Sequence, residues 1–315
     1  VSDHCDGRRF LNPRGHVNRT WLDVLKWRRT SKAHPWPKSV ALDPQSLPPF
    51  NAEGKVSCTL INHATFLLRF PGCNVLTDPI FSDCAGPLGR LGPRRVHPPG
   101  IDFKQLPHID IILLSHDHYD HCDLPTLRRC AWEHGPIIIA PLGHRALLRR
   151  AGFEDDKITE LDWWQNHVGT GGLTITFTPA RHWSNRLSGK RNGRLWGGFY
   201  LQTKDQRVLF TGDTAYDHEH FTSIRQRLGA PDLALIPIGA YEPRWFMAAQ
   251  HCNPAEAVQI HTELDTRQSV GMHWGTFQLT DEARDEPVKA LQEAMEQRGI
   301  SADQFRVLQP GETLV

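Results

Sequence analysis

Residues 115–121, Ser-His-Asp-His-Tyr-Asp-His, decide the fold, because they place three imidazoles and the carboxylate of Asp120 directly after an apolar run that indicates a buried strand. His116 and His118 are two positions apart and can both face one metal ion if the turn is extended, since imidazole is an ordinary zinc ligand. Asp120 and His121 can then reach a second ion. An H-x-H-x-D-H pattern at a strand end is too specific to be a surface histidine cluster without function, and it predicts a metal site.

Three later residues occupy similar positions at the ends of expected strands. His182 follows residues 174–179, Asp213 stands in Thr-Gly-Asp-Thr, and His273 stands in Met-His-Trp-Gly. Each of these residues alone would be weak evidence for a metal site, because a single histidine at a strand end more often has a structural role. Together with the first group they make five histidines and two aspartates, which suit a dinuclear site. We expect His116, His118 and His182 on one metal, Asp120, His121 and His273 on the other, and Asp213 as the bridge.

Short apolar runs separated by Gly, Pro and Asp dominate the chain after Val56 and predict buried β-strands. Stretches with helical periodicity separate them, so the sequence predicts an α/β fold of two similar β-rich halves covered by helices. The expected strands are 57–61, 65–70, 75–77, 109–115, 136–140, 173–178, 198–203, 207–211, 233–237 and 269–272. The expected helices are 125–133, 220–228, 254–264 and 286–298.

The order H-x-H-x-D-H, a distant His, an Asp and a final His resembles the metallo-β-lactamase superfamily. Residues 77–81 (TDPIF), 239–247 (GAYEPRWFM) and 273–277 (HWGTF) are similar to segments of the N-acylphosphatidylethanolamine-hydrolysing phospholipase D family, and the likeness spans about residue 50 to the end. The resemblance implies an αββα sandwich with two zinc ions per chain and places the seven residues above on the family's metal positions. It also implies hydrolysis of an N-acylphosphatidylethanolamine to an N-acylethanolamine and a phosphatidic acid.

The general chemistry also follows from the residues, because a water between two zinc ions loses a proton near neutral pH and a metal pair can hold a phosphoryl oxygen. We expect Asp120 and His251 to be the catalytic residues. His251, in Ala-Ala-Gln-His, matches a histidine near the substrate in the resembled family, and we expect it to contact substrate as well. A structural histidine in a loop before a helix cap is the alternative.

Other residues are expected in supporting roles around the metals. Asp78 is expected to hydrogen-bond a ligand histidine and so orient its ring, although capping of a turn explains this residue nearly as well. His63 is expected to support the ligands structurally from behind. Tyr119, Tyr241 and Phe246 are expected to bind substrate, and ordinary packing is the alternative for each.

The charge of the chain is nearly balanced, with 36 Lys and Arg against 35 Asp and Glu, which argues against a nucleic-acid partner. Seven scattered cysteines without a C-x-x-C pair predict free thiols and a reducing, cytoplasmic location. No apolar run approaches the roughly 18 residues that span a bilayer. Because the sequence begins at Val1 rather than Met, it leaves open whether a leader peptide has been removed. A phospholipid is the expected partner, and the sequence is compatible with a homodimer.

Residues 1–50 differ in composition from residues 51–315, which we expect to form the hydrolase domain. Positions 1–40 hold nine Lys and Arg against three Asp, together with three tryptophans. This composition predicts an extended arm with at most one short helix near residues 21–29. Cations mixed with tryptophan favour anionic interfaces, so the arm is expected to hold the protein peripherally on a membrane surface. The alternative is that the arm folds back and packs on the domain.

Three other functions remain open at this point, because the metal motif alone does not choose a reaction. The nearest is a lactonase of the sugar-phosphate type, which would need a small polar pocket. A di-iron redox protein would be expected to carry a carboxylate in place of His118 and a flavin domain. A noncatalytic metal-binding module would be expected to hold one metal with four ligands and no bridging carboxylate.

Overall fold

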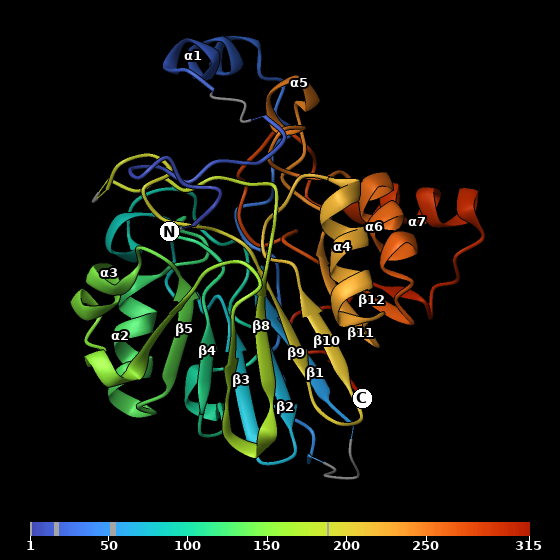
Figure 1. The fold of residues 1–315 in the computed structure, drawn as a ribbon. Helices are drawn as coiled ribbons and strands as arrows, with labels where there is room; N and C mark the ends of the chain where they lie inside the picture. The colour runs from blue at the N-terminus through green and yellow to red at the C-terminus, as the bar shows by residue number, and fades with distance from the viewer. Residues whose placement is uncertain (1, 16–18, 51–54, 188) are drawn as a thin grey trace.

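Two mixed β-sheets packed face to face form the centre of the protein (Figure 1). The computed structural model describes residues 2–15, 19–50, 55–187 and 189–315. In spatial order, the first sheet contains β14 (Thr313–Leu314), β1 (Ser57–Asn62), β2 (Thr65–Phe70), β3 (Cys73–Thr77), β4 (Ile111–Leu113), β5 (Ile137–Pro141) and β6 (Ile158–Leu161). The second contains β13 (Phe305–Arg306), β12 (Gln268–Met272), β11 (Leu233–Pro237), β10 (Arg207–Phe210), β9 (Gly198–Gln202), β8 (Thr174–Thr178) and β7 (Asn166–Val168).

Helices cover the outer face of each sheet. The α-helices are α1 (Trp21–Thr30), α2 (Leu124–Glu133), α3 (Arg145–Arg150), α4 (His218–Leu228), α5 (Arg244–Met247), α6 (Pro254–Leu264) and α7 (Glu286–Arg298), and the 3-10 helices are η1 (Pro87–Gly89), η2 (Phe103–Gln105), η3 (Asp155–Lys157) and η4 (Thr170–Gly172). Figure 1 shows α2 and α3 on one side of the sheets and α4, α6 and α7 on the other. Leu127 of α2 shares a buried cluster with Leu67 of β2, and Val258 of α6 shares one with Leu209 of β10. The predicted αββα sandwich is confirmed.

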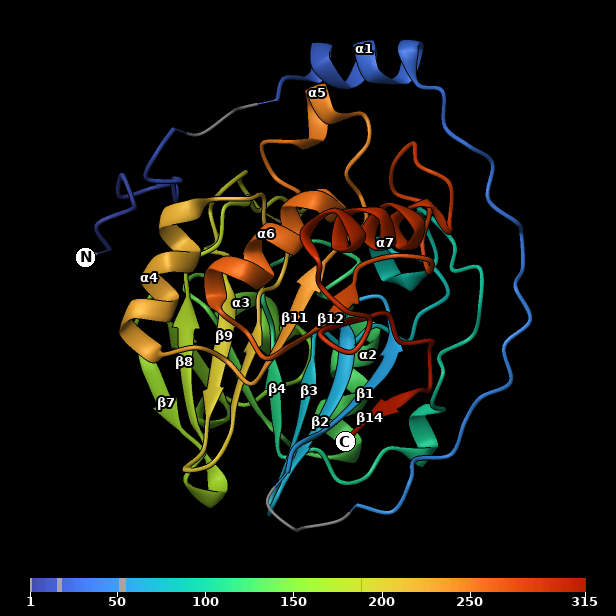
Figure 2. The ribbon, with the colours of Figure 1, turned by 90° about the vertical axis from the view of Figure 1, so that its right-hand side faces the viewer.

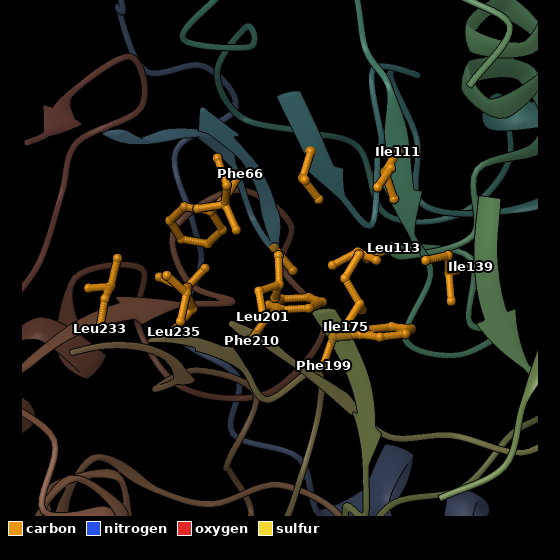
Figure 3. Close-up of a cluster of buried hydrophobic side chains, with 14 of the residues drawn as sticks. Phe66, Ile111, Leu113, Ile139, Ile175, Phe199, Leu201, Phe210, Leu233 and Leu235 are labelled. Atoms are coloured by element: carbon orange, nitrogen blue, oxygen red, sulfur yellow. The ribbon is translucent and has the colours of Figure 1, made fainter. Parts of the chain in front are cut away.

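Side chains from the inner faces of the two sheets meet in one apolar cluster (Figure 3). Phe66 and Leu113 of the first sheet lie in it together with Phe199 and Phe210 of the second. Neighbouring residues of a strand point to opposite faces, so Phe66 lies in this inner cluster and Leu67 in the outer one. Because both faces of each sheet are covered, the strands appear in the sequence as continuous apolar runs rather than alternating ones.

Parallel pairing brings several strand ends to one edge of each sheet. β3 pairs with β4 in parallel, and β10, β11 and β12 are parallel to one another. β8 and β10 both pair with β9 antiparallel, so these two strands run in the same direction. The carboxyl ends of β8, β10 and β12 therefore share an edge, where active sites of α/β sheets are usually built.

All the predicted strands and helices are present, with ends that shift by at most two residues. The strand expected at 109–115 is shorter, because the Ser115 N–H donates to Oδ1 of Asp78 at 2.7 Å rather than to a neighbouring strand. The helix expected from His220 begins two residues earlier, because the side chain of Asp217 caps it. The elements that were not predicted have six residues or fewer and are too short to show a period; they are α3, α5, β6, β7, β13, β14 and the 3-10 helices η1 to η4.

The N-terminal arm runs along the surface of the sandwich (Figure 2). Its one short helix, α1, is capped by Thr20 and has no buried residue. Beyond α1, the arm pairs with the domain through backbone hydrogen bonds from Val40 to Val96 at 2.6 Å and from Gln45 to Gly100 at 2.7 Å. Within the described ranges, no helix has the length and apolarity to cross a bilayer. All seven cysteines are free, as the sequence predicted.

Candidate metal centre

The loops that follow β4, β8, β10 and β12 meet at one edge of the sandwich and bring together all seven expected metal ligands. The side chains are buried or half-buried, so little water competes for their polar atoms. The seven residues are His116, His118, Asp120, His121, His182, Asp213 and His273.

The carboxylate of Asp213 stands at the middle of this group. Its Oδ2 lies 3.2 Å from Nε2 of His121 and 3.2 Å from Nε2 of His273. The same oxygen lies 3.8 Å from Nε2 of His116 and 3.7 Å from Nε2 of His182. One carboxylate therefore faces imidazoles from both expected sets of ligands, which is the arrangement that a bridge between two metals requires.

The first set consists of His116, His118, His182 and Asp213, whose nearest ligand atoms all lie within 4.8 Å of one another. Nε2 of His116 lies 2.9 Å and Nε2 of His182 lies 3.2 Å from Nδ1 of His118. Three imidazoles that converge to this degree, with a carboxylate beside them, form a donor set of the kind that holds zinc.

The second set contains one residue more than expected. Asp120 Oδ2 lies 3.4 Å from Nε2 of His121 and 3.2 Å from Nε2 of His273. It also lies 3.0 Å from Nε2 of His63, whose ring centre is 4.0 Å from that of His273. The sequence assigned His63 a supporting role, and the structure places its ring against Asp120 and within ligand distance of the second set.

The charges of the site favour a bound cation. Burial alone would raise the pKa of Asp213, but His121 and His273 hold that pKa well below its usual range. Burial would likewise lower the pKa of His273, and Asp213 and Asp120 instead raise it to about 9. Burial and the neighbouring imidazoles keep the pKa of His116 well below its usual range, so this ring is in the neutral form that binds metals.

Three neighbours fix the orientation of the ligand rings. Nδ1 of His121 lies 2.6 Å from Oδ2 of Asp78, and Nδ1 of His116 lies 2.8 Å from Oγ of Ser115. Nδ1 of His182 lies 2.8 Å from the carbonyl oxygen of Gln250. In each case the partner occupies Nδ1 and leaves Nε2 for the centre, which is how outer partners orient metal-binding histidines.

Sequence reasoning singled out only one of these three partners, Asp78. Ser115 carries a signal that could have found it, because it stands directly before the first ligand. Gln250 acts through its backbone carbonyl, and no side-chain pattern in the sequence reports such a contact.

Backbone strain also gathers at this edge. His63, Asp78 and His273 have φ values of 45°, 31° and 62°, although none of them is glycine. A side chain in this region costs of order 1–3 kcal/mol and persists only where the surroundings hold it in place. Here the backbone N–H of His273 donates to the carbonyl of His63 at 2.9 Å, so two strained ligand-bearing turns hold each other.

Several buried polar atoms at this site lack a hydrogen-bond partner, as expected of atoms that bind metal ions. Nε2 of His121, Oδ1 of Asp213 and Nδ1 of His251 are buried without a hydrogen-bond partner among the described residues. Buried polar atoms are normally paired, and these three belong to residues that surround the Asp213 carboxylate, where a metal ion would satisfy them. Imidazole and carboxylate donors in two sets suit two zinc ions, so the residues fit the metals that the resemblance implies.

The expected catalytic His251 lies beside the same centre. Its Nδ1 is 3.9 Å from Oδ2 of Asp213, and its ring centre is 5.1 Å from that of His182. The expected substrate residue Tyr119 lies at the rim, where the guanidinium of Arg186 stands 4.0 Å from its ring centre. Trp183, which sequence reasoning missed, lies with its ring centre 4.7 Å from that of His118.

The other two expected substrate residues make contacts away from the metal ligands. The hydroxyl of Tyr241 donates to Oε1 of Glu286 at 3.4 Å, at the start of α7. Phe246 is buried on α5, with its ring centre 5.0 Å from that of Trp27 in α1. Their contact with substrate stays a prediction.

The chain is similar to known proteins over most of its length. Residues 73–274 match the Beta-lactamase superfamily domain. The chain is 38% identical over 257 residues to N-acyl-phosphatidylethanolamine-hydrolyzing phospholipase D 1 of Caenorhabditis elegans, which covers 79% of this chain and 72% of the relative. It is 37% identical over 236 residues to the mitochondrial N-acyl-phosphatidylethanolamine-hydrolyzing phospholipase D of Saccharomyces cerevisiae, which covers 73% of this chain but only half, 50%, of that relative.

A solved structure shows the same fold. Isothiocyanate hydrolase from Delia radicum gut bacteria superposes with a TM-score of 0.65 at 22% sequence identity, over 82% of this chain and 98% of that chain. At this identity the likeness concerns the fold alone.

Replacing Asp213 with Ala should lower the metal content and abolish turnover while leaving the fold intact, because its carboxylate alone faces both sets of ligands. Elemental analysis and circular dichroism of the zinc-loaded proteins measure both effects. The matched control, Asp205→Ala, removes an exposed carboxylate from a loop and should keep two ions per chain. One ion or none per chain in active wild-type protein would contradict the dinuclear site.

Proposed function

Because this chain belongs to the N-acylphosphatidylethanolamine-hydrolysing phospholipase D family of the metallo-β-lactamase superfamily, we propose that it is a zinc-dependent phosphodiesterase of phospholipids. It hydrolyses an N-acylphosphatidylethanolamine to an N-acylethanolamine and a phosphatidic acid. The observation that carries the proposal is the position of Asp213 between two sets of metal-binding side chains.

The residues of this site divide the chemical task. Two zinc ions, when bound, supply a pair of Lewis acids that lowers the pKa of water to near neutrality and polarises a phosphoryl oxygen. The protein holds the ligand rings through Asp78, Ser115 and Gln250, so little reorganisation accompanies the reaction. Cys122 and Cys252 are poor alternative nucleophiles, because burial raises the pKa of the first to about 12 and that of the second further. Water is therefore the nucleophile.

His251 is proposed to hydrogen-bond the phosphoryl group or the leaving oxygen. Its backbone N–H donates to the carbonyl of Met247 at 2.9 Å, which fixes the residue beside the centre. Its Nδ1 is buried and has no hydrogen-bond partner in the described part of the chain. This buried Nδ1, which lies 3.9 Å from Oδ2 of Asp213, can form a hydrogen bond with a substrate oxygen, and that bond would give the nitrogen the partner that it lacks.

Product analysis tests the function. Purified, zinc-loaded protein should release an N-acylethanolamine and phosphatidic acid from an N-acylphosphatidylethanolamine, and it should leave sugar-phosphate lactones intact. Mass spectrometry of the two products measures this over a panel that also contains other phosphodiesters. Lactone hydrolysis without release of N-acylethanolamine would assign the site to the lactonase alternative.

The matched variant for this assay is His251→Ala. It should keep the zinc content and the fold while kcat falls by about 10²–10⁴-fold, as for the loss of an acid–base group. A normal kcat would give His251 a packing role only.

The surface above the site suits a lipid interface. Figures 1 and 2 both show α1 above α5, beyond the edge of the sheets. Trp21 and Leu22 of α1 are 70% and 58% exposed, and Trp245 of α5 is 39% exposed. Lys26 stands 4.8 Å from the ring centre of Trp245. Exposed tryptophan and leucine beside cations favour an anionic membrane surface, so we assign the peripheral membrane contact to α1 and α5.

The path from this projection to the metals is short. α5 ends at Met247, and Gln250 and His251 follow it within four residues. Arg19, just before α1, donates from Nε to the carbonyl of Phe246 at 3.1 Å. A phospholipid headgroup that meets the projection is therefore close to the side chains that would bind its phosphate.

Exchange of Trp21 and Leu22 together for Ser should weaken binding to anionic liposomes and raise KM for vesicle-borne substrate, while kcat on a short soluble diester stays unchanged. Binding should also weaken at high salt, because each Lys or Arg near the surface adds about 1 kcal/mol at low salt. Co-sedimentation at two salt concentrations measures this. The control exchanges Trp132 and Leu88, which are even more exposed, for Ser and should bind like wild type. Equal binding by all three proteins, or by none, would remove the membrane role.

A further inference from the structure

A cavity of about 800 Å³ lies apart from the metal centre, between the arm and the loop that connects β3 to β4. The arm contributes Trp36 and Lys38, and the loop contributes Arg94, Arg95 and His97. None of the seven expected metal ligands lines it. The volume is within the range of small-molecule sites.

The charges around this cavity are mainly positive. Lys38, Arg94 and Arg95 line it together with a single carboxylate, that of Asp83. Arg94 pairs with Asp83 at 3.4 Å, but both side chains are largely exposed, so water and salt weaken this pair. An anion that enters the cavity would therefore meet a surplus of cations.

Arg95 is the unusual member of this set, because it is only 8% exposed. Its Nε and Nη2 donate to the carbonyls of Ser82 and Ile80 at 2.9 and 3.0 Å, and Phe277 lies 5.4 Å from the guanidinium. Its Nη1 has no partner, and no carboxylate pairs with Arg95 among the described residues. Burial lowers the pKa of Arg95 to about 10, so the group stays charged at neutral pH.

The carboxylates of Asp83 and Asp123 act on Arg95 only through longer-range attraction, so an anion in direct contact would stabilise this buried guanidinium further. We propose that this cavity is a second anion site that binds a phosphate group through Arg95, Arg94 and Lys38. The exposed guanidinium of Arg94 can donate two parallel hydrogen bonds to phosphate oxygens, while Arg95 and the ammonium of Lys38 add positive charge. Inorganic phosphate and the phosphomonoester headgroup of phosphatidic acid share this chemistry.

The site also has a direct connection to the metal centre. Nε2 of His97 lies 3.1 Å from Oγ1 of Thr276, which accepts a hydrogen bond from the backbone N–H of His63 at 3.1 Å. Nε2 of His63 in turn lies 3.0 Å from Oδ2 of Asp120. These contacts place His97, at the cavity, beside the turn that carries His63 and so near the second set of ligands. The proposed binding of an anion does not depend on the proposed function.

Calorimetric titration of zinc-loaded protein tests the site, with inorganic phosphate and with short-chain phosphatidic acid as separate probes at low salt. Wild-type protein should bind two phosphate groups, one at the metals and one in the cavity. The double variant Lys38→Ala/Arg94→Ala changes only exposed residues, so it should fold normally and lose affinity in the cavity by about tenfold or more. The control Arg150→Ala/Lys204→Ala removes the same charge from exposed positions elsewhere.

The outcomes separate the alternatives without any measurement of lipid turnover. Two sites in wild type and control with one in the double variant support the proposal. Binding of both probes then assigns the site to phosphate itself, and binding of phosphatidic acid alone assigns it to the lipid headgroup. One site in all three proteins, or an equal loss in the control, overturns it. Failure of the proposed function would instead appear as absent phospholipid hydrolysis with this binding unchanged.

Discussion

One buried carboxylate oxygen, Oδ2 of Asp213, lies 3.2–3.9 Å from ring nitrogens of five histidines, and the other features of the site are arranged around it. An ionised carboxylate at this depth costs several kcal/mol unless cations or hydrogen bonds compensate it. The histidines come from loops after four different strands, so compensation requires that these strand ends meet at one point. The sandwich meets this requirement by running β8, β10 and β12 in the same direction.

The loop that carries the ligand His273 also holds the surface projection formed by α1 and α5. The buried carboxylate of Glu282 accepts hydrogen bonds from the N–H groups of Ala240, whose φ is 61°, and Glu242, at the base of the segment that carries α5. The next residue back, Asp281, accepts from Nε1 of Trp27 in α1 at 2.9 Å. Both anchors follow His273 on one loop, so the projection formed by α1 and α5 is joined to the metal centre through a few hydrogen bonds. Packing alone would not fix the projection, since α1 has no buried residue.

Sequence patterns predicted the strands and the ligand set because both depend on local order. Buried strands are apolar runs, and H-x-H-x-D-H has few uses other than metal binding. Contacts between distant segments were harder to predict: His63 stands far from Asp120 in the sequence, and Gln250 acts through a carbonyl. The hydrogen bond from Tyr241 to Glu286 was likewise not predicted, because the two residues are far apart in the sequence. Short elements such as α5 were missed because four residues carry no period.

The central claim is that water at this centre attacks phosphorus and that the ethanolamine oxygen leaves. Hydrolysis of N-acylphosphatidylethanolamine in heavy-oxygen water tests it directly, because the heavy atom marks the bond that water forms. The account predicts that mass spectrometry finds one heavy oxygen in the phosphatidic acid and none in the N-acylethanolamine. A heavy oxygen in the N-acylethanolamine would show attack on carbon and would contradict it.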